Sequence, residues 1–314
     1  MTLKDFPDAE PSVTLDFLKS KQLDPRITFS RASSGGADGT GSGIVNGEVY
    51  IFQENVPRLT DKGLLLEKNS TNYLLNSATL VTQTVAIPST GRWMLSFYGT
   101  GTVVVSGANS GTLTGTGANE RVSLFLGGTT ISNMTLTVTG TVTKAQLEPG
   151  DRLTSYIPTT TATVTRVADI LEVTGTDFSS WWNESQGTIV FEKDAPGGSG
   201  TVYYYELSDS SRNERHIYTD SGSSSITTAG DTYNYAVGGT KLALGFATDN
   251  TNVCTDGNLQ VLDTSCDMPT GITRMTFAKR FDSNSFRLES GYFQRFAFYP
   301  TRLPDNSLEA LTTQ

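Results

Sequence analysis

Short stretches of alternating apolar and polar residues, each closed by a turn residue, recur along this sequence. Between residues 135 and 143, Leu136, Val138 and Val142 alternate with threonines, which is the period of a half-buried strand. The same alternation recurs in three further stretches: TVVVSG from Thr102, RVSLFLGG from Arg121 and GTIVFEKD from Gly187. Gly, Asn and Asp follow these stretches as turn residues. The pattern predicts an all-β chain of many short antiparallel strands, as in β-sandwiches.

A helical pattern occurs at the end of the chain, in LPDNSLEALTTQ from Leu303. Pro304 or Asp305 suits the start of a helix, and Leu308 and Leu311 then fall on one face. We expect one short terminal helix here, with both leucines facing inward.

The residue composition changes along the chain, and this change predicts two sandwiches in tandem. Residues 1–68 are irregular and include the run SSGGADGTGSG at 33–43, which is expected to be a flexible loop. Residues 69–158 are rich in threonine, glycine and valine, whereas the chain beyond Asp177 is rich in aromatic residues. The expected division is an N-terminal attachment segment at 1–68, a small Thr/Gly-rich β-sandwich at 69–158, a linker and first strand at 159–176, and a larger sandwich at 177–314.

The segment TSYIPTTTATVTRVADIL at 154–171 carries no group that suggests chemistry. Its proline and threonines favour extended backbone, so it is expected to join the two sandwiches. The part VTRVADIL is predicted to enter the second sandwich, with Val167 and either Ile170 or Leu171 facing its core.

Charge and hydropathy exclude several partners. The chain has 314 residues and a net charge of -9, which argues against binding to a phosphate backbone, so no nucleic acid is expected. No run of about 18 apolar residues occurs, and the first residues lack a basic segment followed by an apolar one. We therefore expect a chain that is neither exported through such a signal nor inserted in a membrane.

Three segments resemble a family of bacteriophage and prophage virion proteins. They are LDFLKSKQLDPRITFSRAS at 15–33, PRLTDKGLLLEKNSTNYLLNSA at 57–78 and QLEPGDRLTSYIPTTTATVTRVADIL at 146–171. In that family a similar N-terminal module precedes a concanavalin-A/laminin-G-like jelly roll, and the ending SGYFQRFAFYPTRLPDNSLEALT at 290–312 resembles its last strand and closing helix. The resemblance implies a tail-fibre or tailspike-type structural protein that contacts other virion proteins and host-surface saccharide.

Candidate catalytic groups are few. Enzymes with a concanavalin-A-like fold can carry Glu-x-Asp-x-x-Glu on one strand, because alternate carboxylates reach both sides of a glycosidic bond. Here Glu192 and Asp194 match, but Gly197 replaces the third carboxylate, so both are expected to face solvent. His216 could serve as a general base but has no visible orienting acid, so a surface position is expected. We predict no catalytic residue.

Aromatic residues are the candidates for binding saccharide, since their faces match the C–H face of a pyranose. The candidates are Tyr203, Tyr204, Tyr205, Trp181 and Trp182. Successive strand residues point to opposite faces, so at least one tyrosine is expected in the core. For the two tryptophans a position in the core or at the joint between the sandwiches is favoured over saccharide binding.

The sequence offers few residues for a metal site or for redox chemistry. Asp249, Asn250 and Asp256 could bind Ca²⁺, but their spacing does not fit an EF-hand, and Asp-Gly is an ordinary hairpin turn, which is preferred. Cys254 and Cys266 could form a disulfide if their strands are neighbours, although assembly in a reducing cytoplasm favours free thiols. No metal and no cofactor are expected.

The leading hypothesis is a non-enzymatic virion protein assembled in the host cytoplasm. Its expected partners are other virion proteins and a host glycan, and a homotrimer is expected because an attached fibre must match the symmetry of its docking site. A capsid decoration or cement protein that stabilises the head is the second hypothesis. An enzyme that degrades surface polysaccharide is the third.

Overall fold

The computed structural model describes residues 9–20, 22–38, 49–194, 203–211, 214–219, 224–228, 231–235, 239–260, 264–265, 268–280, 288 and 290–313. The chain is nearly all β, as predicted, and contains two compact units. The large unit comprises residues 1–30, 59–66 and 170–314, and the small unit comprises residues 31–58 and 67–169. Within the described residues, no helix is long and apolar enough to span a membrane.

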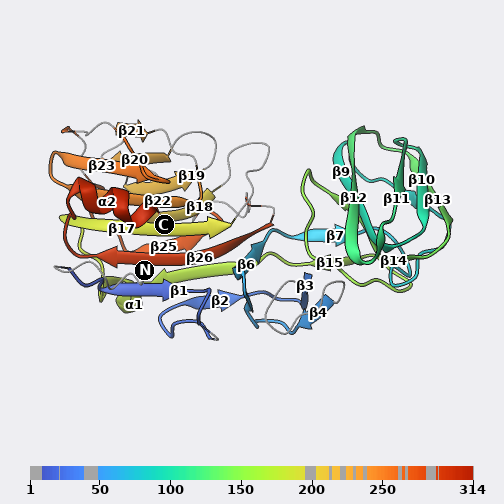
Figure 1. The fold of residues 1–314 in the computed structure, drawn as a ribbon, viewed down its shortest axis with the longest axis horizontal. Helices are drawn as coiled ribbons and strands as arrows, with labels where there is room; N and C mark the ends of the chain where they lie inside the picture. The colour runs from blue at the N-terminus through green and yellow to red at the C-terminus, as the bar shows by residue number, and fades with distance from the viewer. Residues whose placement is uncertain are drawn as a thin grey trace. The chain divides into compact units, whose positions relative to one another are not determined.

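The large unit is built on two antiparallel sheets (Figure 1). The first has the order β24-β23-β22-β17-β26-β6-β5, with β1 also paired to β26. Its strands are β1 (Val13–Asp16), β5 (Arg58–Thr60), β6 (Gly63–Glu67), β17 (Gln186–Asp194), β22 (Lys241–Ala247), β23 (Asn250–Thr255), β24 (Asn258–Leu259) and β26 (Ser290–Tyr299). Apolar side chains of both sheets, such as Phe191, Phe296, Leu171 and Phe277, share one core.

The second sheet of the large unit has the order β2-β16-β25-β18-β19-β20-β21. Its strands are β2 (Thr28–Ser30), β16 (Ile170–Thr174), β18 (Tyr203–Ser208), β19 (Arg215–Thr219), β20 (Ser224–Thr228), β21 (Asp231–Tyr235) and β25 (Arg274–Phe277). All six residues of β18 are buried.

The first strands of the chain belong to the large unit rather than to a separate attachment segment. Strand β1 pairs with β26 from Val13 opposite Phe298 to Asp16 opposite Arg295. Leu15 and Phe17 are buried in the same core as Phe298. The division predicted at residue 68 therefore differs from the compact units, because a strand near one end of the chain completes a sheet formed by the other end.

Helices α1 (Gly175–Ser179) and α2 (Asp305–Thr312) accompany these sheets. The terminal helix that the sequence predicts is confirmed as α2. Leu308 is fully buried and Leu311 packs beside it, against Val190, Ala243 and other side chains on the outer face of the first sheet.

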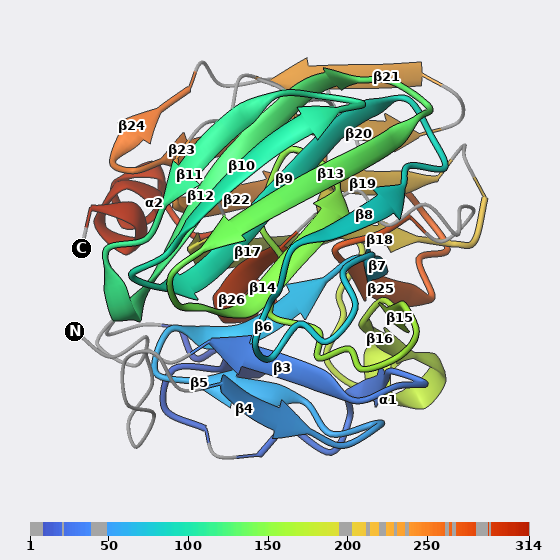
Figure 2. The ribbon, with the colours of Figure 1, turned by 90° about the vertical axis from the view of Figure 1, so that its right-hand side faces the viewer.

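The small unit contains a four-stranded and a three-stranded sheet, with the orders β11-β10-β13-β8 and β12-β9-β14 (Figure 2). Their strands are β8 (Gln83–Ala86), β9 (Gly91–Gly99), β10 (Thr102–Gly107), β11 (Gly111–Thr114), β12 (Gly117–Thr129), β13 (Asn133–Thr139) and β14 (Val142–Pro149). Trp93, Val103, Leu136 and Leu147 are among the side chains from both sheets that form its core. Strands β10 and β17 confirm the strands predicted from Thr102 and Gly187. Burial alternates in β10, whereas five consecutive residues of β17 are buried.

The stretch 135–143 is two strands rather than one. Strand β13 ends at Thr139, the backbone turns at Gly140 with φ +73°, and β14 begins at Val142. Leu136 and Val142 are both buried, but they extend from different sheets. A glycine in the left-handed region made this turn possible without breaking the apolar alternation.

Two short strand pairs complete the small unit: β3 (Gly35–Asp38) with β4 (Val49–Phe52), and β7 (Ser70–Asn72) with β15 (Val164–Arg166). The predicted flexible loop at 33–43 is thus partly a strand, and residues 39–43 lie outside the described residues. Val167, predicted to face a core, is 40% exposed, whereas Leu171 in β16 is fully buried as predicted. The segment 154–171 therefore contributes to both units, and Val167 lies at the change from β15 to β16.

Limited proteolysis is expected to cut the segment 160–163 before the residues that precede it. Residues 160–163 are exposed, whereas Thr154, Ser155, Tyr156 and Ile157 are buried. Proteases need an accessible backbone that can leave its hydrogen bonds. The masses of the first fragments test this expectation, and an early cut between Thr154 and Ile157 would contradict it.

Candidate functional site

The aromatic residues predicted to bind saccharide lie in the core of the large unit. Tyr203, Tyr204 and Tyr205 are 8%, 1% and 0% exposed, and Trp181 is 4% exposed. Trp182 is half-buried and packs against the same core. At least one tyrosine was expected in the core, and all three are buried, as are all six residues of β18. The core position favoured for Trp181 agrees with its burial. Tyr203, Tyr204, Tyr205 and Trp181 therefore do not present the ring faces that saccharide stacking requires, and the predicted binding set is corrected for these four residues.

Contacts between rings occupy the faces of these aromatic side chains. The Trp182 ring lies 4.9 Å from that of Phe298, and the Trp181 ring lies 4.7 Å from that of Phe178. The Tyr205 ring meets that of Phe191 at 5.3 Å in an edge-to-face arrangement. Such pairs add to the stability gained by burying aromatic area. The many aromatic residues beyond Asp177 therefore indicate a large hydrophobic core.

The two carboxylates of the incomplete glycosidase motif lie near the end of β17. Asp194 is exposed, whereas Glu192 is half-buried. The Glu192 carboxylate pairs with Arg295 at 3.3 Å and with Lys241 at 3.9 Å. Gly197 lies outside the described residues. Glu192 is thus part of an ion-pair cluster across β17, β22 and β26, which is a structural role.

His216 is buried, contrary to the surface position predicted for it. It extends from β19, is 1% exposed, and its ring lies 5.3 Å from that of Tyr205. Burial lowers the pKa of the His216 imidazole from 6.5 to about 3, because a charged ring loses its hydration there. The side chain is neutral near pH 7, and its position in the core makes it part of the packing.

Acid is expected to destabilise the large unit through His216. Between its folded pKa of about 3 and its ordinary value of 6.5, the unfolded chain binds a proton that the folded chain does not. The free energy of unfolding therefore falls as pH falls through this window, by up to ~1.4 kcal/mol per pH unit. Urea titrations between about pH 7 and pH 4 measure this slope. His216→Gln, which cannot titrate, is expected to have a shallower slope, and equal slopes would contradict the assignment.

The stretch from Asp249 to Asp256 consists of strand β23 with a hairpin turn at each end, which confirms the preferred interpretation. Asp256 and Gly257 both have positive φ, at 45° and 78°, as the favoured two-residue turn between antiparallel strands requires. The Asp256 carboxylate accepts hydrogen bonds from the backbone N–H groups of Thr240 at 3.1 Å and Lys241 at 2.9 Å. No cluster of three His, Cys, Asp or Glu side chains suited to a metal occurs among the residues that the structure describes.

Cys254 is a free thiol buried on β23. Its sulfur lies 3.1 Å from the Thr312 hydroxyl of α2. Burial raises the pKa of the Cys254 thiol, which lowers its reactivity. Cys266 lies outside the described residues, so the predicted free state of that residue stays a prediction.

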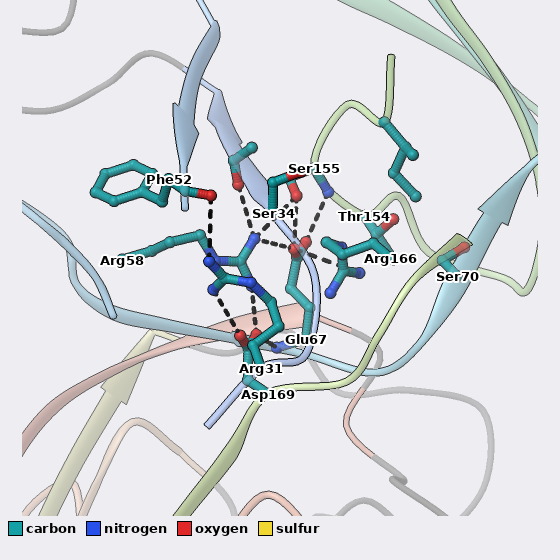
Figure 3. Close-up of polar contacts among 12 residues, drawn as sticks. Arg31, Ser34, Phe52, Arg58, Glu67, Ser70, Thr154, Ser155, Arg166 and Asp169 are labelled. Carbon is teal, nitrogen blue, oxygen red and sulfur yellow. Dashed lines mark hydrogen bonds and ion pairs between the residues drawn. The ribbon is translucent and has the colours of Figure 1, made fainter. Parts of the chain in front are cut away.

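A buried network of charged side chains is the most distinctive polar feature of the small unit (Figure 3). Five residues form it, each at most 1% exposed: Arg31, Arg58, Glu67, Arg166 and Asp169. Charged side chains are almost never fully buried unless they are paired. The network is therefore a specific arrangement that the fold must assemble.

Asp169 joins two arginines to the backbone. Its Oδ1 lies 3.1 Å from Nη1 of Arg31, and its Oδ2 pairs with Nη2 of Arg58. The backbone N–H of Glu67 also donates to Oδ2 at 2.8 Å. These contacts tie Asp169 to residues that lie 102 to 138 positions earlier in the sequence.

Glu67 forms the second centre of the network. Nη1 of Arg58 donates to its Oε2 at 2.5 Å, and the N–H and hydroxyl of Ser155 both donate to the carboxylate at 2.6 Å. Nη2 of Arg166 lies 3.4 Å from Oε2. Burial by itself raises the pKa of the Glu67 carboxyl, but the two arginines and the Ser155 hydrogen bonds outweigh it and hold the pKa at about 2.

Hydrogen bonds to the main chain extend this network. The Arg31 guanidinium donates to the carbonyls of Ser33 at 2.8 Å, Gln53 at 2.7 Å and Val56 at 3.1 Å. Nη1 of Arg58 donates to the carbonyl of Gly36 at 2.7 Å. The two arginines thus hold the backbone on both sides of the β3–β4 pair.

A second buried polar group lies in the same unit around Glu148. Its carboxylate accepts from the Ser70 hydroxyl at 2.6 Å and from the N–H and hydroxyl of Thr154 at 2.9 and 2.5 Å. The Gln146 side chain accepts from the N–H of Ile157 at 2.7 Å. The segment TSYI at 154–157 is therefore fixed by side chains of β14 and β7.

The buried network has a structural role: its ion pairs and hydrogen bonds hold separate segments of the chain together. An ionised, solvent-shielded Glu67 with a pKa near 2 cannot donate a proton near neutral pH. Its oxygens already accept hydrogen bonds from Arg58 and Ser155. The arrangement instead fixes separated segments of the chain against one another.

None of these five charged residues was predicted from the sequence as a site residue. The three segments that carry the family resemblance nevertheless contain all of them: Arg31 in 15–33, Arg58 and Glu67 in 57–78, and Arg166 and Asp169 in 146–171. Ser155 and Glu148 lie in the third segment too. The available signal was the occurrence of isolated charges beside apolar residues, as in GLLLE at 63–67.

Comparisons with known proteins give no family assignment. No family model matches the chain, and no curated protein is similar to it. Among solved structures, the NanB sialidase of Streptococcus pneumoniae aligns with 44% of this chain at 14% identity and a TM-score of 0.37. The match spans about a quarter (26%) of the length of that sialidase.

Two other similar structures are smaller binding domains. The CBM40 domain of the Ruminococcus gnavus IT-sialidase aligns with 42% of this chain and 84% of its own length, at 17% identity and a TM-score of 0.35. The binding domain of botulinum neurotoxin serotype D aligns with 46% of this chain and 40% of its own length, at 9% identity and a TM-score of 0.34. Similarity at this level assigns no activity to the chain.

Proposed function

We propose that this chain is a non-enzymatic structural protein of a bacteriophage virion, of the tail-fibre or tailspike type. One observation carries the proposal: the three segments that resemble virion proteins converge on the buried network of Arg31, Arg58, Glu67, Arg166 and Asp169. The resemblance therefore concerns residues that hold the small unit together. A shared architectural module is what a structural protein would have in common with its relatives.

In this proposal the chain contacts other virion proteins and a saccharide on the host surface. The family resemblance is the support for both partners. Because the three tyrosines and Trp181 are buried and Trp182 packs half-buried against the same core, the proposed saccharide contact is made by other residues.

Particles produced from the genome that encodes this sequence provide the direct test. Mass spectrometry of density-banded virions is expected to detect the chain, and labelled antibodies are expected to mark the tail. Labelling of the head would instead support a capsid decoration protein. Absence of the chain from purified particles would contradict the virion role altogether.

A glycan assay with the full chain tests the saccharide contact and the absence of enzymatic activity. Labelled chain is expected to adsorb to cells of the host and to their purified surface polysaccharide, with no release of new reducing ends. Release of reducing ends would support a polysaccharide-degrading enzyme, which needs a pair of carboxylates across the bond. If the chain does not bind the polysaccharide but binds capsids that lack it, the result would support the role of a capsid decoration protein.

We expect the chain to form a homotrimer. A virion attachment must match the symmetry at its docking site, and several weak saccharide sites bind together more tightly than one. Multi-angle light scattering at micromolar concentration is expected to give three times the chain mass of 33.8 kDa. A monomer at that concentration would count against the trimer.

A further inference from the structure

The outer face of one sheet in the small unit carries threonine, valine and serine. This sheet has the order β11-β10-β13-β8 (Figure 2). Its inward side chains, such as Val103, Val105 and Leu136, are buried in the core of the unit. Their neighbours along each strand point the opposite way, because successive strand residues alternate between the two faces of a sheet. We call this outer surface the threonine face; it consists of Thr84, Thr102, Val104, Ser106, Thr112, Thr114, Thr135, Thr137 and Thr139.

The pairing of the strands places these side chains in rows across the sheet. Val104 of β10 lies opposite Thr112 of β11 and Thr137 of β13. Thr135 lies opposite Thr84 of β8, and their hydroxyl oxygens are 3.0 Å apart. The threonine face is therefore a regular array of hydroxyl and methyl groups. Val104, which is 45% exposed, lies between two of its threonines.

The threonine face is free of charged side chains. No Asp, Glu, Lys or Arg occurs in its four strands, all of whose residues the structure describes, although such residues make up 18% of the chain. The three-stranded sheet of the same unit does contain charged residues: Arg92, Glu120, Arg121, Lys144 and Glu148. Charges on exposed sheets keep soluble proteins from associating. The threonine face lacks this protection.

The charge of the chain and the chemistry of threonine favour a second copy as the partner of this face. Each copy has a net charge of -9, so two copies repel each other. This repulsion is smallest where neither surface carries a charge, because like charges brought together weaken an interface. A hydroxyl group both donates and accepts hydrogen bonds, so the threonine face can pair with the same face of another copy. Its methyl groups and Val104 add apolar area to such a contact.

A saccharide fits the threonine face less well than a second copy does. The four strands contain no Phe, Tyr or Trp. Small-molecule sites are ordinarily concave and use aromatic side chains, whose ring faces stack on the ligand. The threonine face offers hydroxyl and methyl groups alone, which match a surface of the same kind.

We propose that the threonine face is the surface through which copies of this chain associate. The inference names the contact surface of the homo-oligomer proposed above and rests on that oligomer, but not on the virion role or on the number of copies. A twofold or a threefold axis brings the same face of each copy together. The contact removes Val104 and the threonine methyl groups from water and keeps the hydroxyl groups hydrogen-bonded.

Light scattering of the full chain and its variants over a dilution series tests the proposal. Val104→Lys places a charge within the threonine face, where a second copy would shield it from water. We expect the dissociation constant of the oligomer to rise by on the order of 100-fold or more, because a buried charge without a partner is costly. Val104→Thr adds no charge and is expected to associate as the wild type does.

Val164→Lys is the matched control. Val164 is 39% exposed and lies on β15 of the same unit, outside the sheet that carries the threonine face. This variant is expected to keep the dissociation constant of the wild type. Circular dichroism checks that each variant is folded, and Thr137→Lys repeats the test from the neighbouring strand if Val104→Lys does not fold.

The outcomes separate this inference from the proposals on which it builds. If the wild type associates and both Val104→Lys and Thr137→Lys associate equally well, the threonine face is not the contact, although the oligomer stands. Equal weakening by Val164→Lys would also overturn the inference, because added charge alone would then explain the effect. A monomeric wild type would contradict the oligomer and the inference together. Detection of the chain in purified virions tests the virion role independently of all these results.

Discussion

Asp169→Asn is expected to lower the free energy of unfolding of the small unit by ~3–5 kcal/mol. The substitution keeps the shape of the side chain but removes the charge that faces Arg31 and Arg58. Three buried guanidinium groups would then share the single carboxylate of Glu67. Removing one partner of a buried pair is costly because the other charge remains buried and unpaired.

Urea denaturation measures this loss, and hydrogen exchange of peptides from residues 67–169 assigns it to the small unit. Glu54→Gln is the control, because Glu54 is an exposed acid of the same unit. The control is expected to change stability by less than ~0.5 kcal/mol. A change below ~1 kcal/mol for Asp169→Asn would show that the network does not hold the unit together.

Tyr205→Ala is expected to destabilise the large unit by ~3–5 kcal/mol. The side chain is fully buried, and its ring contacts those of Phe191, His216 and Phe296 at 5.3, 5.3 and 6.2 Å. Truncation removes apolar contacts and leaves a cavity that the surrounding sheets cannot fill.

Phe125→Ala provides the contrast for this prediction. Phe125 is 50% exposed on the small unit, so its loss is expected to cost far less than that of Tyr205. Urea titrations of both variants give the comparison. If Tyr205→Ala left stability unchanged but abolished adsorption to host polysaccharide, the saccharide-binding role first predicted for the tyrosines would be restored.

Local features of this protein could be predicted from its sequence. The alternation from Thr102 and from Gly187 indicated strands, and the dipeptide Asp256–Gly257 indicated a hairpin turn. Helix α2 was predicted from Pro304 and the spacing of its leucines. Each of these depends on the backbone preferences or side-chain period of a few neighbouring residues, so the sequence contains the whole signal.

Pairing between distant segments was decided by the tertiary structure. Strand β1 pairs with β26 across more than 270 residues, which no local pattern indicates. His216 lacks an acidic neighbour in the sequence, so a surface position was expected, but its strand faces the core. Tyr203, Tyr204 and Tyr205 are all buried, and the pairing of β18 with β19 shifts register between Tyr203 and Tyr205, so strict alternation along the sequence does not predict their burial.

The buried network is the clearest example of a feature that could not be predicted from the sequence. Single arginines and carboxylates in a sequence are ordinarily exposed, since hydration of a charge favours the surface. The charges of the network are buried because separate segments bring opposite charges together: Arg31 pairs with Asp169, and Arg58 pairs with Glu67. The sequence determined the all-β class, the turns and the closing helix through local preferences. Only the tertiary structure decided which charges are paired, because the compensation for their lost hydration comes from residues far away along the chain.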